Sequence, residues 1–240
     1  MAQEQTSCRL CGSFLKHTFV DLGMSPPCES FVPADRLDQM EPYYPLYALV
    51  CDHCFLVQLK EYFSPAEIFT EYAYFSSYAT SWVDHARVYC EEITEKLSLN
   101  KNSFVVEIAS NDGYLLQHFI PKDIPVLGVE PAANVAQAAV AKGVPTRVDF
   151  FGASLAAHMV ETGQKADLII GNNVLAQVPD LNDFVRGMQI LLKPEGVITL
   201  EFPHLANLIE QNQFDTIYHE HFSYFSLLTI RYMAHRHRLK

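Results

Sequence analysis

Four of the six cysteines form two C-x-x-C pairs, "CRLC" at Cys8 and Cys11 and "CDHC" at Cys51 and Cys54. Each pair offers two sulfurs on one tight turn, and two such pairs are the usual way to build a tetrahedral zinc site from thiolates. Four thiolates close the coordination shell and leave no position for water, so we expect a structural zinc ion. The simpler alternative is that these are ordinary buried cysteines, but burial alone does not require two C-x-x-C pairs. His53, inside the second pair, is either a competing ligand or a solvated histidine.

A second group of reactive side chains lies in "IYHEHFSYFS", Ile217 to Ser226. Two histidines, one glutamate and two tyrosines fall within seven residues, from Tyr218 to Tyr224. These residue types carry out general acid–base chemistry. The alternative is a polar loop that is rich in aromatic residues.

The composition limits the possible partners. The chain has 240 residues, is 49% apolar and carries a net charge of -11, so it can form a core and repels phosphate backbones. We therefore expect no nucleic-acid partner. The start "MAQEQTSCRL" has no apolar signal segment and no apolar run reaches the ~18 residues of a membrane span, so we expect a cytoplasmic protein without a membrane partner.

From residue 104 onward, apolar strands alternate with helical stretches. These elements must position the reactive side chains of 217–226. The expected strands are "FVVEIA", "VLGVE", the weaker "VPTRVDF", "DLIIGNNV" and "GVITLEF", and the expected helices are "GYLLQHF", "AANVAQAAVAKG", "GASLAAHMVETG" and "LNDFVRGMQILLKPEG". This order predicts an α/β fold with a doubly wound parallel sheet. One or two further helices are expected in 61–100, the first opening at "SPAE".

Ligands of such sheets bind beyond the carboxyl ends of the strands. Residues 107–113, "EIASNDG", follow the first strand, and Glu130 follows the second about twenty residues on, where an acid accepts hydrogen bonds from a ribose. The loop has one glycine, Gly113, where a dinucleotide fingerprint has three, which favours S-adenosylmethionine (SAM) over NAD. The alternative for Glu130 is that it caps the next helix.

Two further strands end in polar or aromatic residues. Asp149 and Phe150 end the third strand, where an adenine amine and ring face can be met, and Asn172 and Asn173 end the fourth. A turn that the asparagines stabilise through their own backbone is the alternative to a ligand.

The order of motifs resembles a known family. The two C-x-x-C pairs are followed by "EYAYFSSY", "EIASNDGYLL", "GVEP", "NNVLAQVPD" and "YHEHFSYFS", from about Cys8 to about Thr229. This order resembles the SAM-dependent C-methyltransferases that act on dTDP-4-keto-deoxysugars. The resemblance implies a zinc-binding module, a Rossmann-like SAM-binding domain of class I and a C-terminal sugar-binding domain.

The resemblance also implies roles for individual residues. The residues at the methionine end of SAM are Glu107, Ser110, Asn111 and Gly113; Glu130 holds the ribose, Asp149 and Phe150 lie near the adenine, and Asn172 lies near the reacting end. The residues that act on the sugar are Tyr218, Glu220, His221 and Tyr72, with position 177 as a further substrate contact.

His221 takes the part of general base in this resemblance. It removes a proton from the carbon beside the ketone, while Tyr218 donates a hydrogen bond to the enolate oxygen and Glu220 orients the imidazole or binds a sugar substituent. If the stretch is extended, His219 points the other way, because side chains alternate along a strand.

The chain departs from the family in two ways. Gln177 stands where the family usually has histidine, and glutamine cannot carry a proton at neutral pH. Family members also continue past this point, and "HRHR" at 235–238 has no match and is expected to be a solvated basic end.

We therefore expect an incomplete Rossmann-like sheet. The predicted division is a zinc-binding module at 1–62, a helical connector at 63–100 and a SAM-binding domain at 101–240, with the C-terminal sugar-binding domain absent. The alternatives to a C-methyltransferase are an inactive remnant that binds SAM and zinc, and a dehydrogenase.

Overall fold

The computed structural model describes residues 6–28, 30–69 and 72–240, which form two compact units. The cysteine unit comprises Met1–Pro65, Leu175–Asn182 and Phe202–Lys240, and the parallel-sheet unit comprises Ala66–Val174 and Asp183–Glu201. Both units are discontinuous in sequence, whereas the predicted module, connector and SAM-binding domain are consecutive. That division stays a prediction.

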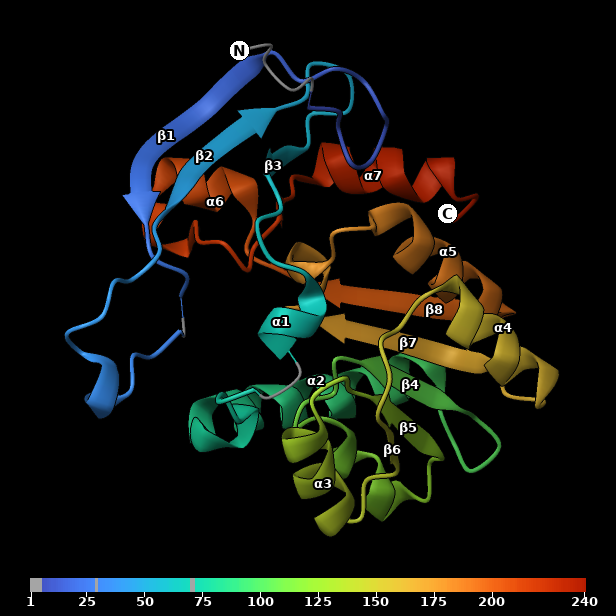
Figure 1. Ribbon diagram of the computed structural model, residues 1–240. Helices are drawn as coiled ribbons and strands as arrows, with labels where there is room; N and C mark the ends of the chain where they lie inside the picture. The colour runs from blue at the N-terminus through green and yellow to red at the C-terminus, as the bar shows by residue number, and fades with distance from the viewer. Residues whose placement is uncertain (1–5, 29, 70–71) are drawn as a thin grey trace. The chain divides into compact units, whose positions relative to one another are not determined.

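The parallel-sheet unit is built on five parallel strands in the order β6-β5-β4-β7-β8 (Figure 1). The strands are β4 (Val105–Ile108), β5 (Val126–Val129), β6 (Thr146–Arg147), β7 (Ala166–Asn172) and β8 (Leu192–Glu201). The connecting helices are α3 (Ala133–Ala141), α4 (Ala153–Glu161) and α5 (Leu181–Leu191). The predicted α/β class with a parallel sheet is confirmed.

The central position of β4 follows from its sequence. All four residues of "VVEI" are buried, as expected for a parallel strand with both faces covered. The preceding helix α2 (Thr80–Leu97) turns Ala86, Cys90 and Ile93 toward the core that also contains Val105. The carboxyl end of β4 is therefore fixed by packing on both sides.

The stretch after β4 differs from the expected helix at "GYLLQHF". It forms two 3-10 helices, η3 (Leu116–His118) and η4 (Ile120–Lys122). Pro121 lies in the first turn of η4 and has no backbone N–H to continue a longer helix. The apolar side chains of the stretch are nevertheless buried, including Leu115, Leu116 and Phe119.

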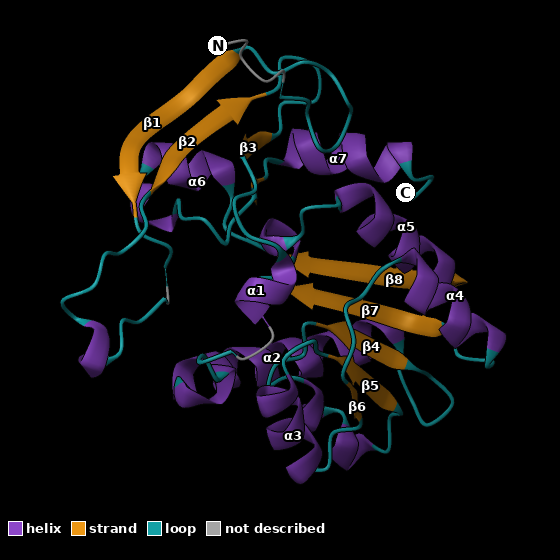
Figure 2. Ribbon diagram, in the orientation of Figure 1, coloured by secondary structure: helices purple, strands orange, loops and turns teal. Residues whose placement is uncertain are grey.

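The cysteine unit contains an antiparallel sheet in the order β1-β2-β3-β9, of which Figure 2 labels the first three strands. Its strands are β1 (His17–Ser25), β2 (Tyr44–Val50), β3 (Val57–Leu59) and β9 (Ser223–Tyr224). The last strand comes from the "YHEHFSYFS" stretch, more than 160 residues beyond β3. The core under this sheet includes Ala48, Val57 and Tyr224.

The remaining helices are short. They are η1 (Ala34–Arg36), α1 (Pro65–Phe69), η2 (Ser76–Tyr78), η5 (Leu175–Gln177), α6 (Leu205–Glu210), η6 (Phe214–Thr216) and α7 (Leu227–Arg236). The predicted helix start at "SPAE" is confirmed, since α1 begins at Pro65. Within the described ranges, no helix is both long enough and apolar enough to cross a membrane.

One close approach in the parallel-sheet unit can be tested by mutation. A Cβ atom at Gly187 in α5 would lie 2.8 Å from the carbonyl carbon of Gly152, a backbone atom that cannot rotate away. We expect Gly187→Ala to lower the free energy of unfolding by roughly 1–3 kcal/mol from overpacking, despite the higher helix propensity of alanine. Urea unfolding followed by circular dichroism measures the change.

The exposed Gln189 on the same helix provides the control. Gln189→Ala should change the free energy of unfolding by less than about 0.5 kcal/mol. Equal stability of the two variants would contradict the packing argument.

Candidate functional site

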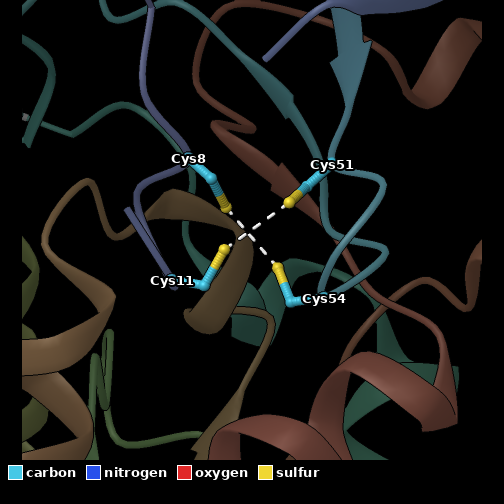
Figure 3. Close-up of side chains that lie close together, drawn as sticks. All are labelled: Cys8, Cys11, Cys51 and Cys54. Atoms are coloured by element: carbon cyan, nitrogen blue, oxygen red, sulfur yellow. Dashed lines mark hydrogen bonds between the residues drawn. The ribbon is translucent and has the colours of Figure 1, made fainter. Parts of the chain in front are cut away.

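The four cysteines of the two C-x-x-C pairs come together in the cysteine unit. Their sulfur atoms all lie within 4.8 Å of one another, and the side chains point toward a common centre (Figure 3). The Sγ atoms of Cys8 and Cys54 are 3.5 Å apart, as are those of Cys11 and Cys51. A tetrahedral zinc ion with Zn–S bonds of about 2.3 Å holds its sulfurs about 3.8 Å apart. The cluster therefore has dimensions suited to zinc.

The two pairs share one backbone design. In the first, the N–H of Gly12 donates to the carbonyl of Cys8 at 2.8 Å, and in the second, the N–H of Phe55 donates to Cys51 at 3.0 Å. Gly12 and Phe55 both have φ in the left-handed region, at 81° and 61°. The glycine adopts this conformation without strain, whereas Phe55 adopts it at a cost that the rest of the site must offset.

Hydrogen-bond donors around the sulfurs also fit thiolates. The Nε2 of Gln58 donates to Cys8 Sγ at 3.2 Å, and the backbone N–H of His53 donates to Cys51 Sγ at 3.4 Å. Hydrogen bonds from Cys54 and from Gln58 lower the pKa of Cys8, whereas burial raises the pKa of Cys51. His53 is exposed, as the solvated alternative expects, and its ring packs edge-on against Tyr232 at 5.6 Å.

A second set of candidate residues lies at the carboxyl end of β4 in the parallel-sheet unit. Glu107 is 1% exposed, and neither of its carboxylate oxygens has a hydrogen-bond partner among the described residues. The same is true of Ser110 Oγ and of one oxygen of Asp112. Burial, followed by the charges of Glu130 and Asp112, raises the pKa of Glu107 well above its usual value. Buried polar atoms without partners mark a place where a polar ligand would supply the missing hydrogen bonds.

The loop after β4 has an unusual backbone. Ala109, Asn111 and Gly113 all have φ in the left-handed region, at 57°, 48° and 76°. The Asn111 side chain accepts from the N–H groups of Ser76 and Asp112, at 2.9 Å each, and donates to the Tyr74 carbonyl at 3.0 Å. Asn111 therefore anchors the "EYAYFSSY" segment to this loop, in addition to the predicted cofactor contact.

Glu130 joins the loop after β4 to the next helix. Its two oxygens accept from the N–H groups of Asn111 and of Ala132, the N-cap residue of α3, both at 2.9 Å. Burial raises its pKa, and the two backbone hydrogen bonds oppose that rise. The capping alternative is thus present in the structure, while the predicted ribose contact stays a prediction.

Sequence reasoning missed two partners of this site. Asp112 is buried and pairs with the Lys142 ammonium at 2.8 Å, and Lys142 also donates to Ser77 Oγ at 2.6 Å. Asp112 stands inside the quoted "SNDG" motif, but Lys142 lies thirty residues away and carries no signal in the sequence.

The remaining predicted cofactor residues lie at strand ends in the same unit. Asp149 pairs with Arg147 at 3.1 Å, and Phe150 is exposed. Asn172 ends β7 and directs a hydrogen-bonding group toward the hydroxyl of Tyr114, as does Trp82. Trp82, the single tryptophan of the chain, also stacks on Tyr114 at 6.2 Å.

Tyr218 and His221 form a hydrogen-bonded pair in the cysteine unit. The Tyr218 hydroxyl is 2.8 Å from His221 Nε2, and His221 Nδ1 is 3.0 Å from the Thr216 carbonyl. A carbonyl only accepts, so Nδ1 carries the proton and Nε2 is left as the basic nitrogen. Burial lowers the pKa of His221 to about 4, which keeps the imidazole neutral at neutral pH.

The stretch around this pair is not extended. The N–H of His221 donates to the Tyr218 carbonyl at 2.9 Å, which closes a turn and brings the two side chains together. Strand alternation therefore does not decide the direction of His219. Its buried ring instead faces an aromatic cluster of Tyr44, Tyr62 and Phe63.

The other predicted sugar residues are divided between the units. Glu220 is buried beside His221 in the turn, and Gln177 ends η5, which contacts β9 in the same unit. Tyr72 belongs to the parallel-sheet unit, where its backbone exchanges hydrogen bonds with Asn134 at 2.7 and 3.2 Å. The roles of these residues stay predictions.

Comparisons with known proteins agree with both parts of the chain. A family model described as a methyltransferase domain matches residues 82–239, and one described as a zinc binding domain matches residues 8–69. The chain is 34% identical over 233 residues to C-methyltransferase NovU of Streptomyces niveus, which covers 97% of this chain. It spans 56% of the length of that relative.

Solved structures show the same fold at low identity. The YcgJ protein of Bacillus subtilis matches with a TM-score of 0.51 and 17% identity, over 65% of this chain and 69% of that protein. A SAM-dependent methyltransferase of Archaeoglobus fulgidus matches with a TM-score of 0.50 and 12% identity, over 64% of this chain and 67% of that protein. With the cysteine cluster, the family models and these folds confirm the predicted fold class and support SAM and zinc as cofactors.

The metal site makes a prediction about the zinc content of the protein. Elemental analysis after dialysis should find one zinc ion per chain, and Cys54→Ser should lose most of it, because a serine hydroxyl is a poor zinc ligand. Cys28→Ser is the matched control, since Cys28 lies outside the cluster, and it should keep the metal. A folded wild-type protein without metal would contradict the site.

Glu107 makes a prediction about the affinity for SAM. Glu107→Gln should weaken SAM binding about 10-fold to 100-fold, because a hydrogen bond to a charged group is worth about 1.5–3 kcal/mol. The free energy of unfolding without ligand should stay equal or rise, since ionising a buried carboxyl without partners costs stability. Calorimetry measures the affinity, and Trp82 fluorescence follows binding.

Glu92→Gln, the same substitution on the exposed face of α2, is the control and should bind SAM as the wild type does. A parallel loss of affinity and stability in Glu107→Gln would indicate a purely structural role.

Proposed function

Because this chain belongs to the methyltransferase domain family, we propose that it transfers a methyl group from SAM to a carbon atom next to the keto group of a dTDP-4-keto-deoxysugar. The relative NovU, at 34% identity, is named a C-methyltransferase. The observation that carries the proposal is the Tyr218–His221 pair, because transfer to carbon needs a base and His221 Nε2 is free of its own proton. The sugar class rests on the motifs that resemble the deoxysugar enzymes.

His221 acts as the base in this proposal. Its Nε2 takes a proton from the carbon beside the ketone, and the electrons of that C–H bond form an enolate. Tyr218 then shifts its hydrogen bond from Nε2 to the enolate oxygen. A pKa of about 4 makes His221 a weak base when alone, and the enolate formed in the same step supplies a negative charge that stabilises the imidazolium.

Other residues hold the two ligands. Bound SAM supplies an electrophilic methyl group. Residues of the parallel-sheet unit would hold it in the roles predicted from sequence: Glu107, Ser110, Asn111 and Gly113 at the methionine end, Glu130 at the ribose, Asp149 and Phe150 at the adenine, and Asn172 near the reacting end. Glu220, Tyr72 and Gln177 would contact the sugar. The closed thiolate shell gives zinc a structural part.

A second candidate is a protein that binds SAM and zinc without turnover. Gln177 favours it, because a glutamine at this position cannot exchange protons. If the enzyme is active, Gln177 serves as a hydrogen-bonding contact alone. A cytoplasmic location and the absence of a nucleic-acid partner stay predictions.

Mass spectrometry distinguishes the two candidates. The chain is incubated with SAM and a dTDP-4-keto-deoxysugar, and the proposal expects a product with one methyl group in place of one hydrogen. His221→Gln should lower the rate by roughly 10²–10⁴-fold, the usual contribution of a general base, with SAM affinity unchanged. Bound SAM without any methylated product would favour the second candidate.

His219→Gln is the matched control, since His219 lies in the same turn but faces the aromatic cluster. It should keep the rate within a few-fold of the wild type.

The pKa of His221 also predicts how the rate depends on pH. The base is lost only on protonation, so kcat/KM should hold down to pH 5 and fall toward pH 4. An acid limb with a midpoint near 6.5 would indicate a base in a different environment.

A further inference from the structure

Gln58 is a buried polar residue between the cysteine cluster and the strand that follows His221. We propose that Gln58 is a positioning residue that couples the first C-x-x-C pair to the Tyr218–His221 pair. The catalytic meaning of this coupling rests on the proposed function, whereas the coupling itself is a property of the cysteine unit. Zinc would then hold the proton-transfer pair in place as well as stabilise the fold.

Both ends of the Gln58 amide contact the first C-x-x-C pair. Its Nε2 donates to Cys8 Sγ at 3.2 Å, and its Oε1 accepts from the backbone N–H of Arg9 at 3.0 Å. A thiolate bound to a metal accepts such a hydrogen bond more strongly than a neutral thiol does. The position of the amide therefore depends on the state of Cys8.

Hydrophobic packing alone does not explain a glutamine at this position. Gln58 is 3% exposed, and its neighbours Val57 and Leu59 in β3 are buried as well. A buried amide costs stability unless it is hydrogen-bonded, and an apolar side chain would avoid that cost. The cysteine sulfur and the Arg9 N–H are the partners that offset it.

The strand β3 carries this connection to β9. Gln58 pairs with Ser223 and Val57 pairs with Tyr224, while the N–H of Leu59 donates to the Phe222 carbonyl at 3.0 Å. All three residues of 222–224 are buried. Any shift of β3 is therefore transmitted to the backbone directly after His221.

Arg9 forms a second connection from the same cysteine pair. Its guanidinium donates to the Leu59 carbonyl and to the Pro179 carbonyl, and its Cζ lies 5.5 Å from the centre of the Phe222 ring. Phe222 directly follows His221 in the sequence. Two neighbouring residues, Cys8 and Arg9, thus reach the 222–224 segment by separate routes.

The Tyr218–His221 pair depends on where this segment lies. The turn that joins the two residues ends at His221, and the His221 ring packs edge-on against Tyr224 at 6.3 Å. The hydrogen bond from Nδ1 to the Thr216 carbonyl fixes which ring nitrogen is basic. A small displacement of β9 would weaken that bond and allow the other tautomer.

The test uses Gln58→Met, which keeps the length of the side chain and removes both hydrogen bonds. Zinc affinity is measured by competition with a chromophoric chelator, and the His221 ring nitrogens are followed by NMR in the full chain at saturating zinc. We expect zinc to bind about 10-fold to 100-fold more weakly, as for other partners of metal ligands. We also expect the Nδ1–H signal of His221 to shift or broaden. The ring-nitrogen signals of His85, whose Nε2 lies 3.0 Å from Glu201 Oε2 in the parallel-sheet unit, should stay unchanged.

Ser223→Ala is the matched control on the facing strand. The Ser223 hydroxyl is buried and has no hydrogen-bond partner among the described residues, so its removal costs no hydrogen bond. Zinc affinity and the His221 signals should remain those of the wild type. An equal response in Ser223→Ala would overturn the specific role of Gln58.

Zinc removal from the wild type gives an independent measurement if Gln58→Met does not fold. Chelation should alter the His221 signals and added zinc should restore them. Unchanged His221 signals after zinc loss, with the His85 signal also unchanged, would overturn the coupling. The proposed function and the coupling can fail separately. If the His221→Gln variant keeps methyl transfer while the His221 signals of the wild type still respond to zinc, the proposed function fails and the coupling stands.

Discussion

Four sulfur atoms within 4.8 Å of one another impose the main constraint on the cysteine unit. As thiolates they repel each other strongly in a buried site. A divalent cation at their centre attracts all four and outweighs that repulsion. The unit gains from this contribution, because its residues come from three separate stretches of chain. The strand β9, with only two residues, has few hydrogen bonds of its own to hold it.

The parallel-sheet unit shows the opposite balance between stability and function. Its core is extensive, and it tolerates Glu107, Ser110 and Asp112 with polar atoms that lack partners among the described residues. It also tolerates three left-handed residues in the loop after β4. Such features cost folding free energy, and they gather at the strand end where ligands of this fold bind. The ligand-free protein is thus less stable than an equally packed sheet without a site.

The sequence predicted the features that depend on local spacing. The two C-x-x-C pairs identified the cysteine cluster, and the apolar runs identified the strands of the parallel sheet, because a strand with two buried faces has a recognisable pattern. One local error has a physical reason: Pro121 limits "GYLLQHF" and the residues after it to 3-10 helices. The direction of His219 depended on an extended stretch, and the hydrogen bond from the His221 N–H to the Tyr218 carbonyl makes this stretch a turn instead.

Long-range pairings were beyond the sequence. Nothing in "VQL" indicates that Gln58 meets a cysteine fifty residues earlier or a serine 165 residues later. The Asp112–Lys142 ion pair is similar, since each residue alone is an ordinary charged residue. These contacts depend on which elements become neighbours in the fold. The local sequence does not indicate that pairing, which is visible only in the folded structure.

The pKa of His221 shows why the assembled fold matters for chemistry. Isolated histidine is partly protonated near neutral pH, whereas burial keeps His221 neutral at the price of a weaker base. A weak base removes a proton from carbon effectively only when the product charges lie close together in a dry site. The Thr216 carbonyl partly compensates, since its hydrogen bond stabilises the protonated ring and raises the pKa against burial. The turn from Thr216 to His221 therefore sets both which nitrogen is basic and how basic it is.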